Sequence, residues 1–215
     1  MGLLVLSMPS LLRGLAITVL LGVVSFVLGS VLGGLITLAR ISRHRTLKVV
    51  AIAYVSVFRG TPLLIQIMLV YFGLPQLGVQ IPPIPSAILT FTLYSGAYLS
   101  ENFRGGILAV DKGQWEAAGS MGMTYGRALR RVVFPQAVRV ATPAIGSRFI
   151  SLMKDTSLAS VITVVELTRV AESVGSSSFR YVEAFVMAGI VYWLINTTLS
   201  VGQEVLERRM GRAYT

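Results

Sequence analysis

Two stretches of this chain, residues 14–39 and residues 184–203, contain no charged side chain. Both are rich in Leu, Ile and Val, and a helix needs about 20 predominantly apolar residues to cross the hydrocarbon core of a membrane. Charged residues make up 13% of the sequence, well below the roughly 25% of soluble domains. Because one soluble core could not bury so many apolar blocks, the sequence predicts an all-α membrane protein.

The apolar blocks are separated by segments rich in Pro, Gly and basic residues. Prolines at 82, 83 and 85 precede the third block, Pro135 precedes the fourth, and a Gly-Ser-Ser-Ser stretch at 175–178 precedes the fifth. Proline is poorly tolerated inside a helix, so these positions mark boundaries. We expect a single domain over residues 1–215 with five transmembrane helices, near residues 12–39, 49–74, 84–108, 137–165 and 182–205.

Basic residues choose the orientation, because Lys and Arg concentrate in cytoplasmic loops. Most of them fall between spans one and two, between spans three and four, and after span five: Arg40, Arg43, Arg45, Lys48, Lys112, Arg127, Arg130, Arg131, Arg208, Arg209 and Arg212. The opposite side carries only Arg13, Arg169 and Arg180. We therefore expect the N-terminus outside and the C-terminus in the cytoplasm.

The net charge of +10 is explained by this topology, and no nucleic-acid partner is expected. With no cysteine in the sequence, disulfides and Cys-ligated metal sites are excluded. The single histidine, His44, lies in a basic loop, and we expect no metal or cofactor bound by this chain. Membrane lipid is an expected partner.

The longest expected cytoplasmic segment, residues 111–135, has the composition of a docking element. Glu116, Ala117 and Ala118 are good helix formers, and Gly122 can supply an unusual backbone angle where the chain turns. Arg127 and Arg130, with Arg131, lie at helical spacing and form a basic face. The segment is either a docking helix for a cytoplasmic partner or a solvated connector.

The same segment resembles the signature loop of binding-protein-dependent ABC importer permeases. That loop reads Glu-Ala-Ala, three residues, Gly, nine residues and then a short apolar segment that ends in Pro; here these are Glu116-Ala117-Ala118, Gly122 and Val132-x-Phe134-Pro135. Further matches to the polar amino acid permeases are Phe58-Arg59-Gly60-Thr61-Pro62, Ser95-Gly96-Ala97-Tyr98 and Lys154-Asp155-Thr156-Ser157-Leu158. The Phe-Arg-Gly-Thr-Pro element narrows the resemblance to the amino acid branch. The similarity covers nearly the whole chain. The final Val-x-Phe-Pro departs mildly from the usual Ile-x-Leu-Pro.

The resemblance implies a type I importer fold, a bacterial inner-membrane location and a defined set of partners. These are a second permease subunit, identical or different, two cytoplasmic ATPases that bind the Glu-Ala-Ala loops, and an extracytoplasmic binding protein that delivers an amino acid. The chain contains no Gly-x4-Gly-Lys-[Ser/Thr] motif for nucleotide phosphates. We therefore expect it not to be an enzyme, with ATP and Mg used by the partner ATPases, and transport by alternating access.

Four charged residues stand out inside the expected spans, Arg59, Glu101, Arg148 and Asp155, because charge there is costly and usually faces a cavity or a partner. Arg148 and Asp155 are seven residues apart and share a helical face. For Arg59, Glu101 and Arg148 the favoured interpretation is internal pairing, Arg59 with Glu101 and Arg148 with a backbone carbonyl or an acid. For Asp155, a structural role and a substrate-binding role stay equally open.

A substrate pocket is predicted from depth. Counted at about 1.5 Å per residue from the expected cytoplasmic ends, Gln66 and Asp155 lie roughly 25 Å deep and Tyr94 roughly 20 Å. Tyr94 and Tyr98 share one helical face. We predict that Gln66, Tyr94, Tyr98 and Asp155 bind the substrate, with Asp155 facing an amino group. An acid at this depth tilts the expectation toward arginine, lysine or histidine, although glutamine and cystine carriers share the motifs.

Backbone breaks and close contacts are also predicted. Pro62 removes a backbone hydrogen bond beside Gly60 and should kink span two as a gate or hinge, and Pro143 could do the same in span four. The spacing of Gly29 and Gly33 permits close helix contact, which we expect within the subunit.

Two rival classes remain. A secondary amino acid transporter driven by an ion gradient would favour internally repeated spans with broken helices, and no internal repeat is found here. A non-transporting scaffold subunit is the second rival. The polar residues that share helical faces inside the spans, Arg148 with Asp155 and Tyr94 with Tyr98, argue against it.

Overall fold

The computed structural model describes the backbone of residues 2–211 and the side chains of residues 8–209. Its longer helices, in chain order, are α1 (Gly2–Ile41), α2 (Arg45–Gly60), α4 (Pro83–Leu108), α7 (Phe134–Asp155) and α9 (Tyr181–Gly211). Shorter elements join them: α3 (Leu63–Met68), η1 (Leu69–Gly73), η2 (Leu74–Leu77), α5 (Lys112–Ser120), α6 (Tyr125–Ala128), η3 (Leu129–Val133), η4 (Thr156–Ile162) and α8 (Leu167–Ser178). The described chain is helical and contains no strand.

Two described helices are long and apolar enough to cross a membrane, over Met8–Ile41 and Tyr181–Arg209. A third crossing is possible if α2 and the helices over Leu63–Leu77 form one broken span, since the two parts are bent by 104°. The expected kink beside Gly60 and Pro62 is therefore confirmed, whereas α7 continues through Pro143. The number of five crossings stays a prediction.

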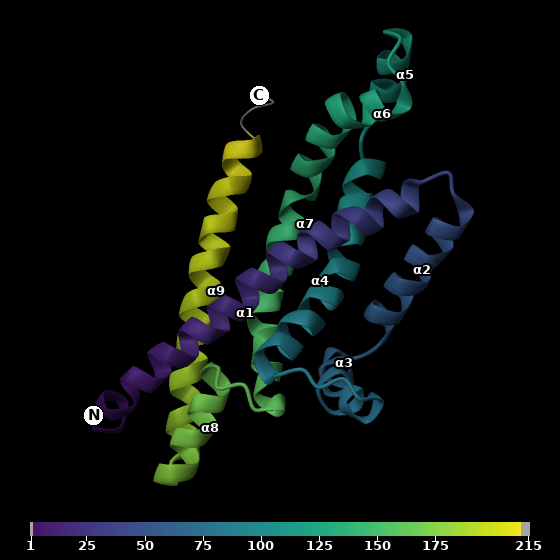
Figure 1. Cartoon of the computed structure of the whole chain (residues 1–215). Coiled ribbons are helices and arrows are strands. Elements are labelled where there is room, and N and C mark those ends of the chain that lie inside the picture. Colours follow the sequence, from purple (N-terminus) through teal and green to yellow (C-terminus); the bar gives the residue numbers. More distant parts are fainter. Residues whose placement is uncertain (1, 212–215) are drawn as a thin grey trace.

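Helix α1 lies across α4 and α7 (Figure 1), and its closest approach depends on glycine. A Cβ added at Gly29 would lie 2.9 Å from Cβ of Ser95, and one at Gly33 would lie 3.0 Å from the carbonyl oxygen of Gly96. Side chains at these positions would push the helices apart. The expected packing of Gly29 and Gly33 within the subunit is confirmed.

The main hydrophobic core is built from α1, α3, α4, α7 and η4 together. Its fully or nearly fully buried side chains include Leu21, Leu63, Ile67, Phe91, Leu152 and Ile162. A second cluster joins α1, α8 and α9 through Leu11, Leu167, Val170 and Ala188. Residues 137–165 are not one α-helix, because α7 passes into the 3₁₀ helix η4, which ends at Thr163 in the left-handed conformation.

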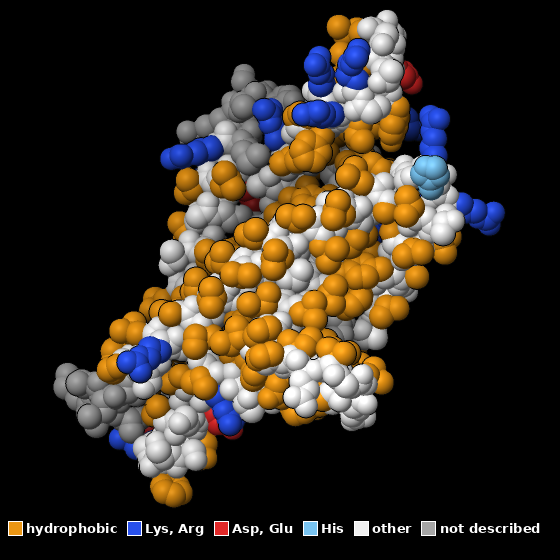
Figure 2. Space-filling model, viewed as in Figure 1, with side chains coloured by type: hydrophobic (Ala, Val, Ile, Leu, Met, Phe, Trp, Pro, Cys, Tyr) orange, Lys and Arg blue, Asp and Glu red, His pale blue; other side chains and the backbone are white. Residues whose placement is uncertain are grey.

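The molecule has one strongly basic end. Helix α9 runs toward the end that carries α5 and α6, whereas α1 begins at the other end (Figure 1). Figure 2 shows Lys and Arg gathered around α5 and α6, above a face that is mostly hydrophobic. Arg212, which belongs to the expected basic tail, lies outside the described residues.

Candidate functional site

The segment 111–135 forms a helical hairpin at the basic end, which we call the docking elbow. Asp111 begins it, because its Oδ1 accepts a hydrogen bond from the Gly113 N–H at 2.7 Å and caps α5. Glu116 and Ala117 are exposed, whereas Ala118 is buried against the rest of the elbow. The motif therefore presents part of its sequence to the surroundings on a capped helix.

The elbow turns sharply at Gly122, whose φ of +74° lies in the left-handed region. Only glycine adopts this conformation without steric cost, so the unusual backbone angle expected there is confirmed. Trp115 of α5 stacks on Tyr125 of α6, with ring centroids 5.1 Å apart. The stacked rings hold the two helices together and make the elbow a defined shape.

Three arginines give the elbow its charge. Arg127, Arg130 and Arg131 are exposed, and none of them forms an ion pair with another side chain of the described residues. Glu116 lies on the preceding helix, also exposed. Unpaired exposed cations beside an exposed acid leave the elbow free to make charged contacts with a partner.

A second candidate site lies between α4 and α7, where charge and aromatic rings meet. Arg148 donates to Asp155 at 3.1 Å, and the two side chains are 9% and 30% exposed. The guanidinium carbon of Arg148 lies 4.7 Å from the ring centroids of both Tyr94 and Tyr98, within range of a cation–π interaction. The expected pairing of Arg148 with an acid is confirmed, and the acid is Asp155.

The same row of groups continues to Glu101. Arg59 lies 5.1 Å from the Tyr98 ring and 3.8 Å from the Glu101 carboxylate, so the expected pairing of Arg59 with Glu101 is confirmed. Glu101 also pairs with Arg104 at 2.7 Å and with Arg40. We call the row from Asp155 to Glu101 the polar corridor; it consists of Asp155, Arg148, Tyr94, Tyr98, Arg59 and Glu101.

The corridor itself holds two guanidinium groups and two carboxylates, and the flanking Arg40 and Arg104, which also pair with Glu101, give the region an excess of positive charge. An amino acid zwitterion has groups that match both ends of such a row. Its carboxylate can pair with a guanidinium, and its ammonium can pair with Asp155 or lie over a tyrosine ring. The geometry therefore suits a small polar solute with opposite charges close together.

Gln66 has a different environment from the corridor. Its Nε2 donates to the carbonyl oxygens of Phe58 and Thr61, at 2.9 and 3.1 Å, and lies 2.8 Å from the Thr61 hydroxyl. Pro62 and the break between α2 and α3 leave these carbonyls without helical partners, and Gln66 satisfies them. The described residues include no hydrogen bond between Gln66 and the corridor. Its role in substrate binding stays a prediction.

Two features of this region were not predicted from the sequence. Arg40 was assigned to a loop, yet its guanidinium reaches Glu101 on α4. Glu166 is fully buried between the main and second clusters, and accepts hydrogen bonds from the N–H groups of Thr168 and Arg169 and from the Tyr192 hydroxyl. Burial raises the pKa of this carboxyl, and these hydrogen bonds oppose the rise. Glu166 stands directly before α8 as its N-cap residue, and an acid at the start of a helix is a signal that the sequence did contain.

Comparison with known proteins identifies the family. Residues 25–212 match the family described as "Binding-protein-dependent transport system inner membrane component". The chain belongs to this family. Among its relatives, the L-cystine transport system permease protein TcyB of Bacillus subtilis (strain 168) is 44% identical over 95% of this chain and 88% of its own length. The arginine transport system permease protein ArtQ of the same organism is 41% identical, over 94% of this chain and 93% of its own.

A solved structure has the same fold. It is titled "Crystal structure of an amino acid ABC transporter with histidines", and its matching chain is 38% identical, with a TM-score of 0.92 over 96% of both chains. The chain is thus an all-helical membrane protein with an ABC transporter permease fold. As a member of this family it is a transport component of the inner membrane.

Proposed function

We propose that this chain is the permease subunit of an ATP-driven importer for a polar amino acid. The observation that carries the proposal is the docking elbow, which presents Glu116 and Ala117 on a capped helix braced by a stacked aromatic pair. The relatives named for cystine and arginine transport support an amino acid as the substrate class. The elbow would be held by a separate ATPase that uses ATP and Mg.

The remaining partners follow from this assignment. A second permease subunit would complete the passage, two ATPases would bind the two elbows, and an extracytoplasmic binding protein would deliver the solute. The basic end that carries the elbow is the cytoplasmic side in this account, since Lys and Arg favour that side. The C-terminus then lies in the cytoplasm and the N-terminus outside.

The polar corridor is the proposed substrate route within this subunit. In the structure Arg148 neutralises Asp155, so a substrate ammonium would have to share or displace that contact. The substrate carboxylate would meet the excess guanidinium charge near Arg59. Movement of the elbow would shift α7, which continues directly from its η3 helix, and so reorient Arg148 and Asp155 against the tyrosines of α4. This is alternating access, with Gly60 and Pro62 as the hinge of the broken span.

The test is uptake by vesicles that contain this chain, its second permease, the ATPase and the binding protein. We expect uptake of a polar amino acid to require ATP on the elbow side, and to stop when the ATPase is left out. Uptake that continues without the ATPase, driven by an ion gradient, would instead establish a secondary transporter.

A further inference from the structure

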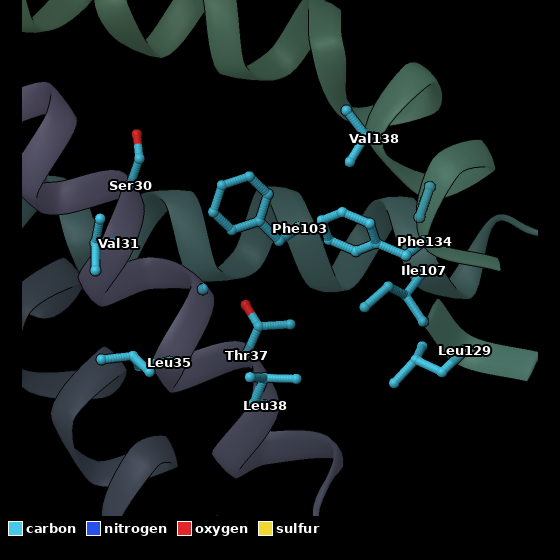
Figure 3. Close-up of a pocket in the computed structure, with 12 residues that line it drawn as sticks. Ser30, Val31, Leu35, Thr37, Leu38, Phe103, Ile107, Leu129, Phe134 and Val138 are labelled. Atoms are coloured by element: carbon cyan, nitrogen blue, oxygen red, sulfur yellow. The ribbon is translucent and has the colours of Figure 1, made fainter. Parts of the chain in front are cut away.

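An apolar groove of about 380 Å³ runs along α1, and its other walls are α4, η3 and α7. Figure 3 shows Leu35 and Leu38 of α1 on one wall and the rings of Phe103 and Phe134 on the other. This volume lies within the roughly 300–1,000 Å³ that ligand pockets occupy. The groove is separate from the polar corridor, since the two share no lining residue.

The groove offers no free hydrogen-bonding group to an occupant. Its two hydroxyl groups are used within the chain: Ser30 donates to the carbonyl oxygen of Phe26 at 2.7 Å, and Thr37 lies 2.8 and 3.1 Å from the carbonyl oxygens of Gly33 and Ser100. A polar ligand would find no free partner there and would lose its hydration. The occupant that fits is therefore a hydrocarbon.

The groove also opens outward from a membrane-spanning helix. Val31, Leu35 and Leu38 line it and are 62%, 60% and 55% exposed, and all three lie within the apolar stretch of α1 that can cross a membrane. Gly34 leaves the wall open, because a Cβ added there would meet no atom within 4 Å. Exposed apolar side chains on a helix that crosses the membrane are expected to contact lipid hydrocarbon chains.

Basic residues follow in the chain beyond one end of the groove, after both α1 and Leu129. Beyond Leu38, α1 ends and the exposed Arg43 follows; beyond Leu129, the exposed Arg130 and Arg131 follow. Within the described residues none of these three arginines forms an ion pair. Basic clusters at the cytoplasmic end of transmembrane helices attract anionic lipid headgroups. A second copy of this chain would bring the same arginines against them, which disfavours it as the occupant.

We propose that this groove binds one acyl chain of an anionic phospholipid of the cytoplasmic leaflet, with its phosphate held between Arg43 and Arg131. The assignment to the cytoplasmic leaflet rests on the proposed function, in which the elbow lies on the cytoplasmic side. The lipid would wedge between α1 and the η3–α7 junction, where the elbow enters the membrane. Lipid bound there stabilises one arrangement of the elbow relative to α1, so anionic lipid would regulate coupling.

The test measures lipid retained by the purified full chain, using native mass spectrometry after exchange into phosphatidylglycerol or phosphatidylcholine. Gly34→Leu fills the groove, and Gly189→Leu on α9 is the matched control, because a Cβ at Gly189 also meets nothing within 4 Å. We expect the wild type and Gly189→Leu to retain one phosphatidylglycerol in preference to phosphatidylcholine, and Gly34→Leu to lose it. Equal retention by the two glycine variants would overturn the proposal.

A second variant tests the headgroup contact. Each basic side chain near an anionic surface contributes about 1 kcal/mol, a factor of about five, so Arg43→Ala combined with Arg131→Ala should weaken phosphatidylglycerol binding roughly 25-fold. No loss of preference for phosphatidylglycerol would refute the basic rim. A disulfide between two copies carrying Val31→Cys would make the groove a contact between copies and would also refute the proposal. Because binding is measured without transport, its failure is distinguishable from failure of the proposed function.

Discussion

Replacing Asp155 with Asn should destabilise the chain strongly, because it leaves Arg148 charged and nearly enclosed. The Arg148 side chain is 9% exposed and its only carboxylate partner among the described residues is Asp155. Removing one partner of a buried ion pair costs about 3–5 kcal/mol. Because the Asp155 side chain is 30% exposed, we expect a loss of unfolding free energy at the lower end of this range, about 3 kcal/mol.

The assay is thermal unfolding of the purified chain in detergent, followed by tryptophan fluorescence. For a chain of this size 1 kcal/mol moves the midpoint by about 2–4 °C, so Asp155→Asn should lower it by roughly 6–12 °C. Glu172→Gln is the control, since its pair with Arg169 has the same chemistry but side chains that are 49% and 41% exposed. Exposed pairs contribute about 0–1 kcal/mol.

A double variant separates the buried charge from the loss of Asp155 itself. Adding Arg148→Gln to Asp155→Asn removes the unpaired guanidinium and should recover about 1–3 kcal/mol, the usual coupling between residues in contact. If Asp155→Asn unfolds at the same temperature as Glu172→Gln, the ion pair between Arg148 and Asp155 within α7 does not stabilise the fold. The reasoning on the polar corridor would then be wrong.

Three further changes test other parts of the account. Gly122→Ala forces alanine into a left-handed conformation, at a cost of about 1–2 kcal/mol, and should reduce ATP-driven uptake without changing the amount of protein in the membrane. The control Gly126→Ala, where the added Cβ meets open space, should leave uptake unchanged. Equal uptake by the two variants would contradict the role of the turn. Gln66→Leu leaves the carbonyls at the break without their donor, at about 1–3 kcal/mol, and an unchanged unfolding midpoint would show that Gln66 does not hold the break. Glu166→Ala removes a buried cap worth about 0.5–2 kcal/mol and should speed hydrogen exchange in α8; exchange as slow as in the wild type would refute the capping role.

Local sequence signals predicted the features that depend on backbone chemistry. Gly122 turns the elbow because only glycine takes its φ cheaply, and Pro62 breaks the second span because it has no N–H to donate. Gly29 and Gly33 predicted close helix packing, because two glycines on one face of a helix let the backbone of another helix approach. In each case the cause lies within a few residues of the effect.

Features that depend on how distant helices cross could not be predicted in this way. Arg40 looked like a loop cation, and only the crossing of α1 over α4 brings it to Glu101. Depth counting predicted Gln66 at the level of Asp155. The 104° bend between α2 and α3 gives Gln66 the carbonyls at the break as partners, which a count along a straight helix does not foresee. Its role in substrate binding stays a prediction.

Cross-linking at the docking elbow tests the central claim most directly, and the natural sequence has no cysteine to interfere. Ala117→Cys places one thiol on the exposed side of α5, and Ser176→Cys places one on the exposed side of α8 as the control. A short thiol-to-amine cross-linker applied to the assembled transporter should join Ala117→Cys to the ATPase, with a yield that changes on ATP addition, and leave Ser176→Cys unlinked to it. No link from Ala117→Cys to an ATPase, or an equal link from Ser176→Cys, would contradict the assignment of the elbow as the coupling element.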